Sequence, residues 1–167
     1  MFKLSKKEQK TLVKLMKKMS FPVPLEVFEA WCRVFGTVCA EAVVVRKNKG
    51  QNEIFLTYRK DKFFKGWHIP GCTHLPIEKI EDTLKRVMKK EIGILFYKAS
   101  QLGWFERVFG RSRGQSQRGH EFSIVFVVRT SQKVKEDNVA KFFPLKKLPK
   151  NIMHHQLPII KKLKEFF

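Results

Sequence analysis

The chain has 167 residues, the size of one ordinary domain, and its 43% hydrophobic content with 16 Phe excludes a disordered polypeptide. Its 35 Lys and Arg against 15 Asp and Glu give a formal net charge of +20, which predicts an anionic partner such as a nucleotide, RNA or an anionic surface. The three Cys are too few and too irregularly spaced for a disulfide framework or a zinc site, so we expect a cytoplasmic protein. No apolar run approaches the length of a transmembrane segment.

The chain is expected to begin with an N-terminal helical extension over residues 1–36, followed by the main domain over residues 37–167. The first helix, about Lys6 to Met19, places apolar residues on one side and lysines on the rest, as expected of an accessory helix that covers a sheet. A basic amphipathic helix of this kind can also lie on a membrane or on RNA. A second helix is predicted from Leu25 to Phe35, after Pro24.

The main domain alternates strand-like and helical segments. Runs of β-branched and aromatic residues predict strands at 38–46, 54–59, 101–109 and 122–129. A polar loop rich in glycine and arginine separates the last two runs, and a closing helix is expected around Pro158. This order of elements predicts an α/β fold, arranged as an α/β/α sandwich.

The segment from Trp67 to Ile94 carries the most information about chemistry. Pro70 and Gly71 end a short strand-like run, and apolar residues then recur at three- and four-residue steps from Glu78 to Ile92, which predicts an amphipathic helix. Gly93 is expected to cap that helix.

Particular residues of this segment fall at fixed spacings. Counting from Cys72, a glutamate follows at Glu78, an arginine at Arg86, a second glutamate at Glu91 and a glycine at Gly93. The pattern resembles the Nudix box, G-x5-E-x7-R-E-U-x-E-E-x-G-U, of the Nudix hydrolases. That resemblance implies a mixed sheet between helices and the hydrolysis of a nucleoside diphosphate linked to another moiety, with Mg²⁺ or Mn²⁺ as cofactor.

The box is degenerate at three positions. Cys72 replaces the opening glycine, Val87 replaces the glutamate after the arginine, and Lys90 replaces the first of the paired glutamates. Of the three helix carboxylates only Glu91 is present, so a multi-metal site of the usual kind is not expected. Glu78, at the first glutamate position of the box, is a further candidate metal ligand.

Two explanations of the degenerate box remain open. The first is a resemblance to the GDP-mannose mannosyl hydrolases, which implies that Glu91 and the carbonyl of Gly71 bind a single metal ion and that Arg86 lies near the diphosphate of a nucleotide sugar. The alignment with that branch makes Asp137 a candidate metal ligand, while the neighbouring Asn138 cannot act as a base. The second is a catalytically weak or inactive protein that still binds a nucleotide or RNA.

Further residues are candidates for the site. By the same resemblance Glu41 contacts the nucleobase and Arg59 contacts the diphosphate, whereas Lys90 is hypothesised to take over part of the charge of the absent metal ion. Candidate general bases and further substrate contacts are His120, Glu121, Arg111, Arg113 and Trp104. The oligomeric state stays open, with a homodimer as one option.

Overall fold

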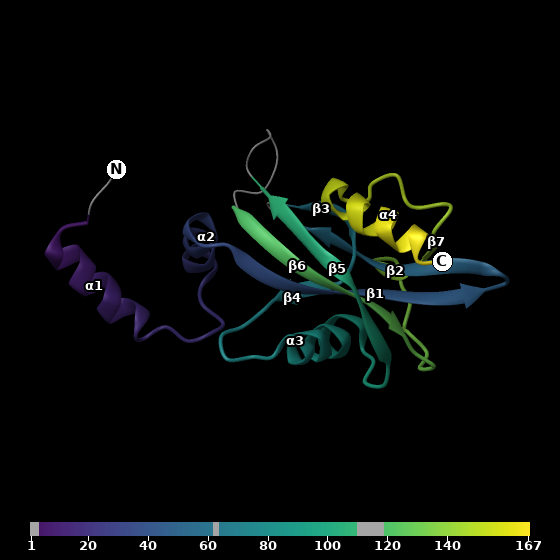
Figure 1. The fold of residues 1–167 in the computed structure, drawn as a ribbon, viewed down its shortest axis with the longest axis horizontal. Helices are drawn as coiled ribbons and strands as arrows, with labels where there is room; N and C mark the ends of the chain where they lie inside the picture. The colour runs from purple at the N-terminus through teal and green to yellow at the C-terminus, as the bar shows by residue number, and fades with distance from the viewer. Residues whose placement is uncertain (1–3, 62–63, 110–118) are drawn as a thin grey trace.

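The computed structural model describes residues 4–61, 64–109 and 119–167, and its ribbon shows a central sheet between two helices, with a helical arm at the N-terminus (Figure 1). The sheet has the strand order β3-β2-β1-β6-β5, with β4 added to β1 and β7 added to β2. Its strands are β1 (Thr37–Asn48), β2 (Gln51–Lys60), β3 (Lys65–His68), β4 (Gly71–Thr73), β5 (Lys98–Val108), β6 (His120–Arg129) and β7 (Ala140–Pro144). Strands β1 and β6 run parallel and the other pairs run antiparallel, so the predicted mixed sheet is confirmed.

Each face of the sheet is covered by one helix because the side chains of β1 alternate between two apolar layers. Ala42 and Val44 pack towards α3 (Ile80–Val87), whereas Val43 and Val45 pack towards α4 (Leu157–Glu165). All four residues are buried. The predicted α/β/α sandwich is therefore confirmed.

The helix of the box is shorter and less regular than the predicted helix from Glu78 to Ile92. Ile77 adopts a positive φ of 65°, and the Glu78 carboxylate accepts the backbone N–H of Leu75 at 3.1 Å, so the α-helix begins only at Ile80. A π-helical turn, η1 (Met88–Ile92), continues it, and Gly93 ends it with φ 78°.

The N-terminal extension forms α1 (Lys6–Met16) and α2 (Leu25–Val34). The expectation that the first helix covers the sheet is wrong, because α1 has no buried residue and stands apart from the sandwich (Figure 1). Helix α2 lies beside the sheet, and its Cys32 is buried. A 3-10 turn, η2 (His154–Gln156), leads into α4. No helix of the described residues is long and apolar enough to cross a membrane.

Candidate functional site

A cavity of about 400 Å³ opens at one end of the sheet, where residues of β1, β4, β5 and β6 meet. Residues of β2, β3, η1, η2 and α2, with neighbouring loop residues, complete its wall. The cavity gathers several of the predicted site residues, namely Glu41, Arg59, Gly71, Glu91 and Glu121. The sequence segments that supply these five groups span residues 41–121, so the fold is what brings them together.

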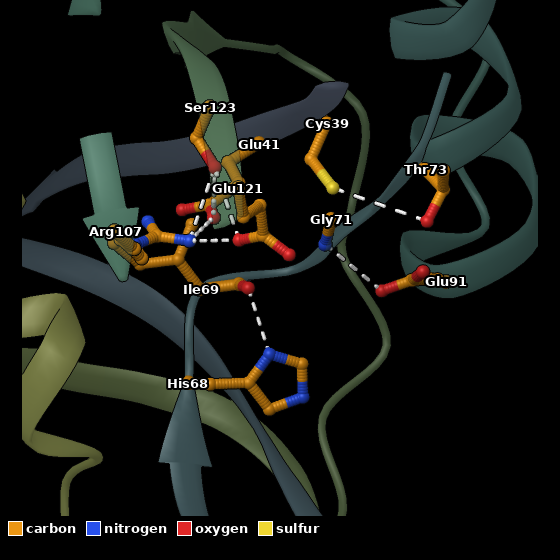
Figure 2. Close-up of polar contacts among 10 residues, drawn as sticks. All are labelled: Cys39, Glu41, His68, Ile69, Gly71, Thr73, Glu91, Arg107, Glu121 and Ser123. Atoms are coloured by element: carbon orange, nitrogen blue, oxygen red, sulfur yellow. Dashed lines mark hydrogen bonds and ion pairs between the residues drawn. The ribbon is translucent and has the colours of Figure 1, made fainter. Parts of the chain in front are cut away.

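A buried arginine occupies the floor of this cavity. Arg107 is 8% exposed, and its Nη1 donates to Oε1 of Glu41 at 2.5 Å, to Oε1 of Glu121 at 2.7 Å and to Oγ of Ser123 at 3.0 Å (Figure 2). Oγ of Ser123 in turn donates to Oε1 of Glu41 at 3.0 Å. We call these four residues the Arg107 cluster.

Strand register explains the Arg107 cluster. In the parallel pair β1–β6, Thr37 lies opposite Glu121 and Cys39 lies opposite Ser123, while in the antiparallel pair β5–β6 Arg107 lies opposite Glu121. Because side chains alternate along a strand, all of these residues point to the same face of the sheet. Glu41, two residues after Cys39, joins them on that face.

Burial decides the electrostatics of the cluster. Desolvation raises the pKa of Glu41, although the neighbouring Arg107 opposes that shift, and the two glutamates in turn raise the pKa of Arg107 despite its burial. Desolvation also raises the pKa of the Cys39 thiol well above its usual range, which leaves that thiol protonated. Among the described residues, Oε2 of Glu41 and Nε and Nη2 of Arg107 have no hydrogen-bond partner.

The remaining carboxylate of the box meets the glycine of β4. Ala42 N–H donates to the Pro70 carbonyl at 2.9 Å, so the alternation of an antiparallel pair turns both the N–H and the C=O of Gly71 away from β1. The Gly71 N–H donates to Oε2 of Glu91 at 3.2 Å (Figure 2). Desolvation of the Glu91 carboxyl group raises its pKa to about 7.

Only glycine fits at position 71. A Cβ there would lie 2.7 Å from Cγ of Glu41 and 2.9 Å from the carbonyl oxygen of Ala40. The absence of a side chain therefore lets the Gly71 backbone lie directly against Glu41.

The two oxygen ligands that the sequence proposed for a metal, the Glu91 carboxylate and the Gly71 carbonyl, therefore lie on one side of β4. A carboxylate and a carbonyl are hard ligands, and they fit one Mg²⁺ or Mn²⁺ that draws its other ligands from water and substrate phosphates. No group of three or more His, Cys, Asp or Glu suited to a metal is found in the part of the chain that the structure describes. The donor set thus fits a single shared ion rather than a closed protein cage.

Glu78 and Arg86 are bound to each other outside the cavity lining. Nε and Nη2 of Arg86 donate to the two oxygens of Glu78 at 3.0 and 2.8 Å, and Nη2 also donates to the Thr73 carbonyl at 2.8 Å. Oε2 of Glu78 additionally accepts the hydroxyl of Thr83 at 2.8 Å. This pairing with Arg86 lowers the pKa of Glu78 to about 2. Both side chains hold the loop before α3, and neither lines the cavity in this conformation.

The other predicted residues lie away from the cavity. Asp137 accepts the N–H of Val139 at 2.8 Å in the loop before β7. Nε2 of His120 pairs with Oε1 of Glu106 at 2.6 Å, and Trp104 is 65% exposed on the sheet face opposite Arg107, three residues along the same strand. Lys90 is exposed and does not line the cavity. Arg111 and Arg113 lie outside the described residues.

Sequence reasoning missed Arg107 and the position of His68. Nδ1 of His68 donates to the Ile69 carbonyl at 2.8 Å, so Nε2 accepts the hydroxyl of Thr57 at 3.2 Å. Burial lowers the pKa of this imidazole to about 4, which keeps it neutral at physiological pH. A signal that points to a residue such as Arg107 is the pair Glu121 and Ser123, at a two-residue step in an apolar strand, because two polar side chains on one buried face need a polar partner there.

An aromatic group also lines the cavity and was not predicted. The rings of Phe64, Phe109 and His155 meet edge to face, with centroids 5.4 to 5.8 Å apart. Beside them, Gln156 is 3% exposed, and its Oε1 has no hydrogen-bond partner within the described ranges. The cavity thus has a charged part around Arg107 and Glu91 and an aromatic part around His155.

Solved structures of several proteins share this fold. The NUDIX domain of Shewanella oneidensis NrtR, complexed with ADP ribose, is 17% identical with a TM-score of 0.62, over 92% of this chain and 97% of that domain. A MutT NUDIX hydrolase from Burkholderia pseudomallei is 20% identical with a TM-score of 0.62, over 77% and 98%. The C. elegans Ap4A hydrolase is 17% identical with a TM-score of 0.60, over 79% and 98%. None of these three is a GDP-mannose hydrolase, so the resemblance to that branch stays a prediction.

No curated protein matches the sequence. A family model described as the NUDIX domain matches residues 38–163, from β1 into α4. That match covers about three quarters of the chain and includes the box and every strand of the cavity. On this evidence the chain belongs to the NUDIX family.

Proposed function

We propose that this protein is a Nudix hydrolase that cleaves a nucleoside diphosphate linked to another moiety, with one divalent cation. The observation that carries the proposal is that Gly71, Glu91 and the three charged residues of the Arg107 cluster line a single cavity. When bound by Glu91 and the Gly71 carbonyl, Mg²⁺ or Mn²⁺ would neutralise the charge of the diphosphate. A nucleotide sugar is the specific substrate that the form of the box favours.

Glu121 is the general base of this proposal. Its Oε1 is fixed by Arg107, and its other oxygen is turned away from Arg107 (Figure 2). That oxygen would accept a proton from the attacking water. For a nucleotide sugar, the water oxygen would bond to the sugar carbon, while the bond from that carbon to the diphosphate oxygen breaks and this oxygen keeps the electron pair. The geometry favours Glu121 over His120, whose ring is paired with Glu106.

Two further features support binding of a nucleotide. Arg59 lines the cavity and its Nε donates to Asp61 at 2.5 Å, which leaves the terminal nitrogens as candidates for phosphate contacts. The aromatic part around Phe64 and His155 offers ring surfaces for a base. The names of the similar proteins point the same way, since Ap4A and ADP ribose are both adenine nucleotides.

The experiment is a panel of nucleotide sugars, dinucleotides, nucleoside triphosphates and capped RNA, incubated with Mg²⁺ or Mn²⁺. Wild type is compared with Glu91→Gln, Glu121→Gln and the matched control Glu106→Gln, whose carboxylate lies in β5 outside the cavity lining. We expect the first two variants to lose at least about a hundredfold in kcat and the control to keep its rate. Full activity in Glu91→Gln would remove the metal assignment.

A second candidate function is nucleotide or RNA binding without turnover. Val87 is fully packed in the apolar layer under the sheet and Lys90 is exposed, so neither position supplies a second carboxylate. No product from any member of the panel, together with measurable binding of one of them by calorimetry, would favour this candidate.

A further inference from the structure

Helix α1 has no structural partner in the described part of the chain. None of its 11 residues is buried, and it extends from the end of the molecule beyond α2 (Figure 1). Its start is nevertheless well formed, because Ser5 and Glu8 make a capping box with hydrogen bonds of 2.7 and 3.3 Å. A helix this short is marginal in water without tertiary packing, so a surface that covers it would stabilise it.

The side chains of α1 and the turn that follows it are divided between two opposite faces. At 100° per residue, four of the five apolar side chains of α1 and this turn fall within one arc of about 100°. These are Leu12, Leu15, Met16 and Met19, whereas Val13 lies about 60° outside this arc, next to the lysines. The lysines fall within the opposite arc, also of about 120°. They are Lys6, Lys7, Lys10, Lys14, Lys17 and Lys18.

The apolar face is open to solvent. Leu12 is 46% exposed, Leu15 is 57% exposed, and Met16 and Met19 are 39% and 38% exposed. Met19 lies in the turn after α1, where its N–H donates to the carbonyl of Met16 at 3.1 Å, so the stripe continues past the last helical residue. The helix therefore presents a continuous apolar stripe opposite six cations.

Charge decides which surface fits this helix. A second copy of the chain would bring another formal charge of +20 against it, which is unfavourable. RNA would satisfy the lysines but has no apolar phase to receive the leucines and methionines. An anionic bilayer satisfies both faces, because apolar side chains enter the headgroup–acyl boundary while long lysine side chains reach the anionic headgroups.

We propose that α1 binds the surface of an anionic lipid bilayer and holds the NUDIX domain there. This inference rests on α1 alone and is independent of the proposed hydrolysis. Helix α2, which follows α1 in the chain, contributes Phe28 to the cavity wall, so the membrane-bound end would be separated from the site by one helix.

The test is sedimentation of the full-length protein with vesicles of phosphatidylcholine alone or with about 30% phosphatidylglycerol. We expect binding to the anionic vesicles only, weakened by added salt because the attraction is partly electrostatic. In one variant, Leu12→Glu with Met16→Glu, the apolar stripe is interrupted, and binding should be lost although no buried residue changes.

A second pair of variants separates the helix from the overall charge. Lys7→Glu with Lys14→Glu lowers the net charge by four, and so does the control, Lys147→Glu with Lys161→Glu, at exposed positions outside α1. We expect the first pair to weaken binding at least about tenfold and the control to weaken it much less. Equal losses in the two pairs, or unchanged vesicle binding in the Leu12 and Met16 variant, would overturn the proposal. RNA binding without vesicle binding would overturn it as well.

Discussion

Replacing Arg107 by Met is the most direct test of how the cavity is held together. The arginine side chain is 7% exposed, and its partners Glu41 and Glu121 are 6% and 10% exposed, so both ion pairs are shielded from water. Removing one partner of a buried ion pair costs about 3–5 kcal/mol because an unpaired charge stays behind. With a urea m-value of about 2 kcal/mol/M, the unfolding midpoint should fall by about 1.5–2.5 M.

The loss of stability in Arg107→Met should depend on pH in a defined direction. Burial already raises the pKa of Glu41 in the folded protein, and without Arg107 that pKa rises further. A carboxyl group with a raised folded pKa contributes stability below its unfolded pKa of about 4.5, and this contribution is lost as pH rises through the folded value. In Arg107→Met, Glu41 can stay neutral at pH 5, whereas at pH 8 it must ionise without its partner or keep its proton at a free-energy cost that grows with pH. The difference in the free energy of unfolding between wild type and Arg107→Met should therefore be smaller at pH 5 than at pH 8.

Arg46→Met is the matched control. Arg46 also bridges two glutamates, with Nε 2.6 Å from Glu53 and Nη1 2.7 Å from Glu136, but its side chain is 39% exposed. An exposed network of this kind contributes about 1 kcal/mol or less. Urea unfolding followed by circular dichroism at pH 5 and pH 8 measures both variants. If Arg107→Met loses no more stability than Arg46→Met at pH 8, the assignment of a buried, charge-dependent cluster is wrong.

Three other outcomes are expected. Without metal, Glu91→Gln should be more stable than wild type at pH 8 and equal to it at pH 4, because the Glu91 pKa of about 7 makes the ionised carboxylate unfavourable in the folded protein. A thermal melt in EDTA checks this, and a melting temperature of the variant below that of wild type at pH 8 would contradict it. Glu78→Gln should be less stable than wild type at pH 7, and this difference should vanish near pH 2, because the stability from the Glu78 carboxylate paired with Arg86 is lost as pH falls through its folded pKa of about 2. Unfolding midpoints of both proteins at the two pH values measure the difference. His155→Ala should raise KM for a nucleotide substrate about fivefold or more, while Trp104→Ala leaves KM unchanged, and equal effects of the two variants would argue against the aromatic part as a base site.

Local patterns predicted the fold well because its elements follow from short-range physics. The β-branched run around Val43 is long and apolar, as expected of a central strand covered on both faces, and it forms β1. The short strand β4 was missed, since three residues around Cys72 carry no periodic signal of their own. The early start predicted for the box helix was also wrong, because the Glu78 side chain binds the backbone of Leu75 instead of entering the helix.

The site was predicted in part, and the reason is again physical. Gly71 and Glu91 lie within one short segment, and the resemblance of that segment to a known motif implied that the two residues belong together. Arg107 meets Glu41 across 66 positions of the chain, through the register of three strands, and a single sequence does not specify that register. A charge inside a strand as apolar as that of Glu41 needs a partner, but this requirement does not identify the residue that supplies it.

The pairing of charges in the structure gives a physical reason for the degenerate box. Glu78 is neutralised by Arg86, and Glu41 and Glu121 share Arg107. Within the described residues, Glu91 is the one carboxylate of these four that is not hydrogen-bonded to an arginine, and it accepts the Gly71 N–H instead. With Val87 and Lys90 in place of two further carboxylates, the anionic charge open to a metal ion is small. A second dication would find the carboxylates of Glu41 and Glu121 already paired with Arg107 in the same cavity. Under the proposed function, one ion shared with a diphosphate would balance this arrangement, because the substrate itself would supply the negative charge that ordinary members of the family place on the box helix.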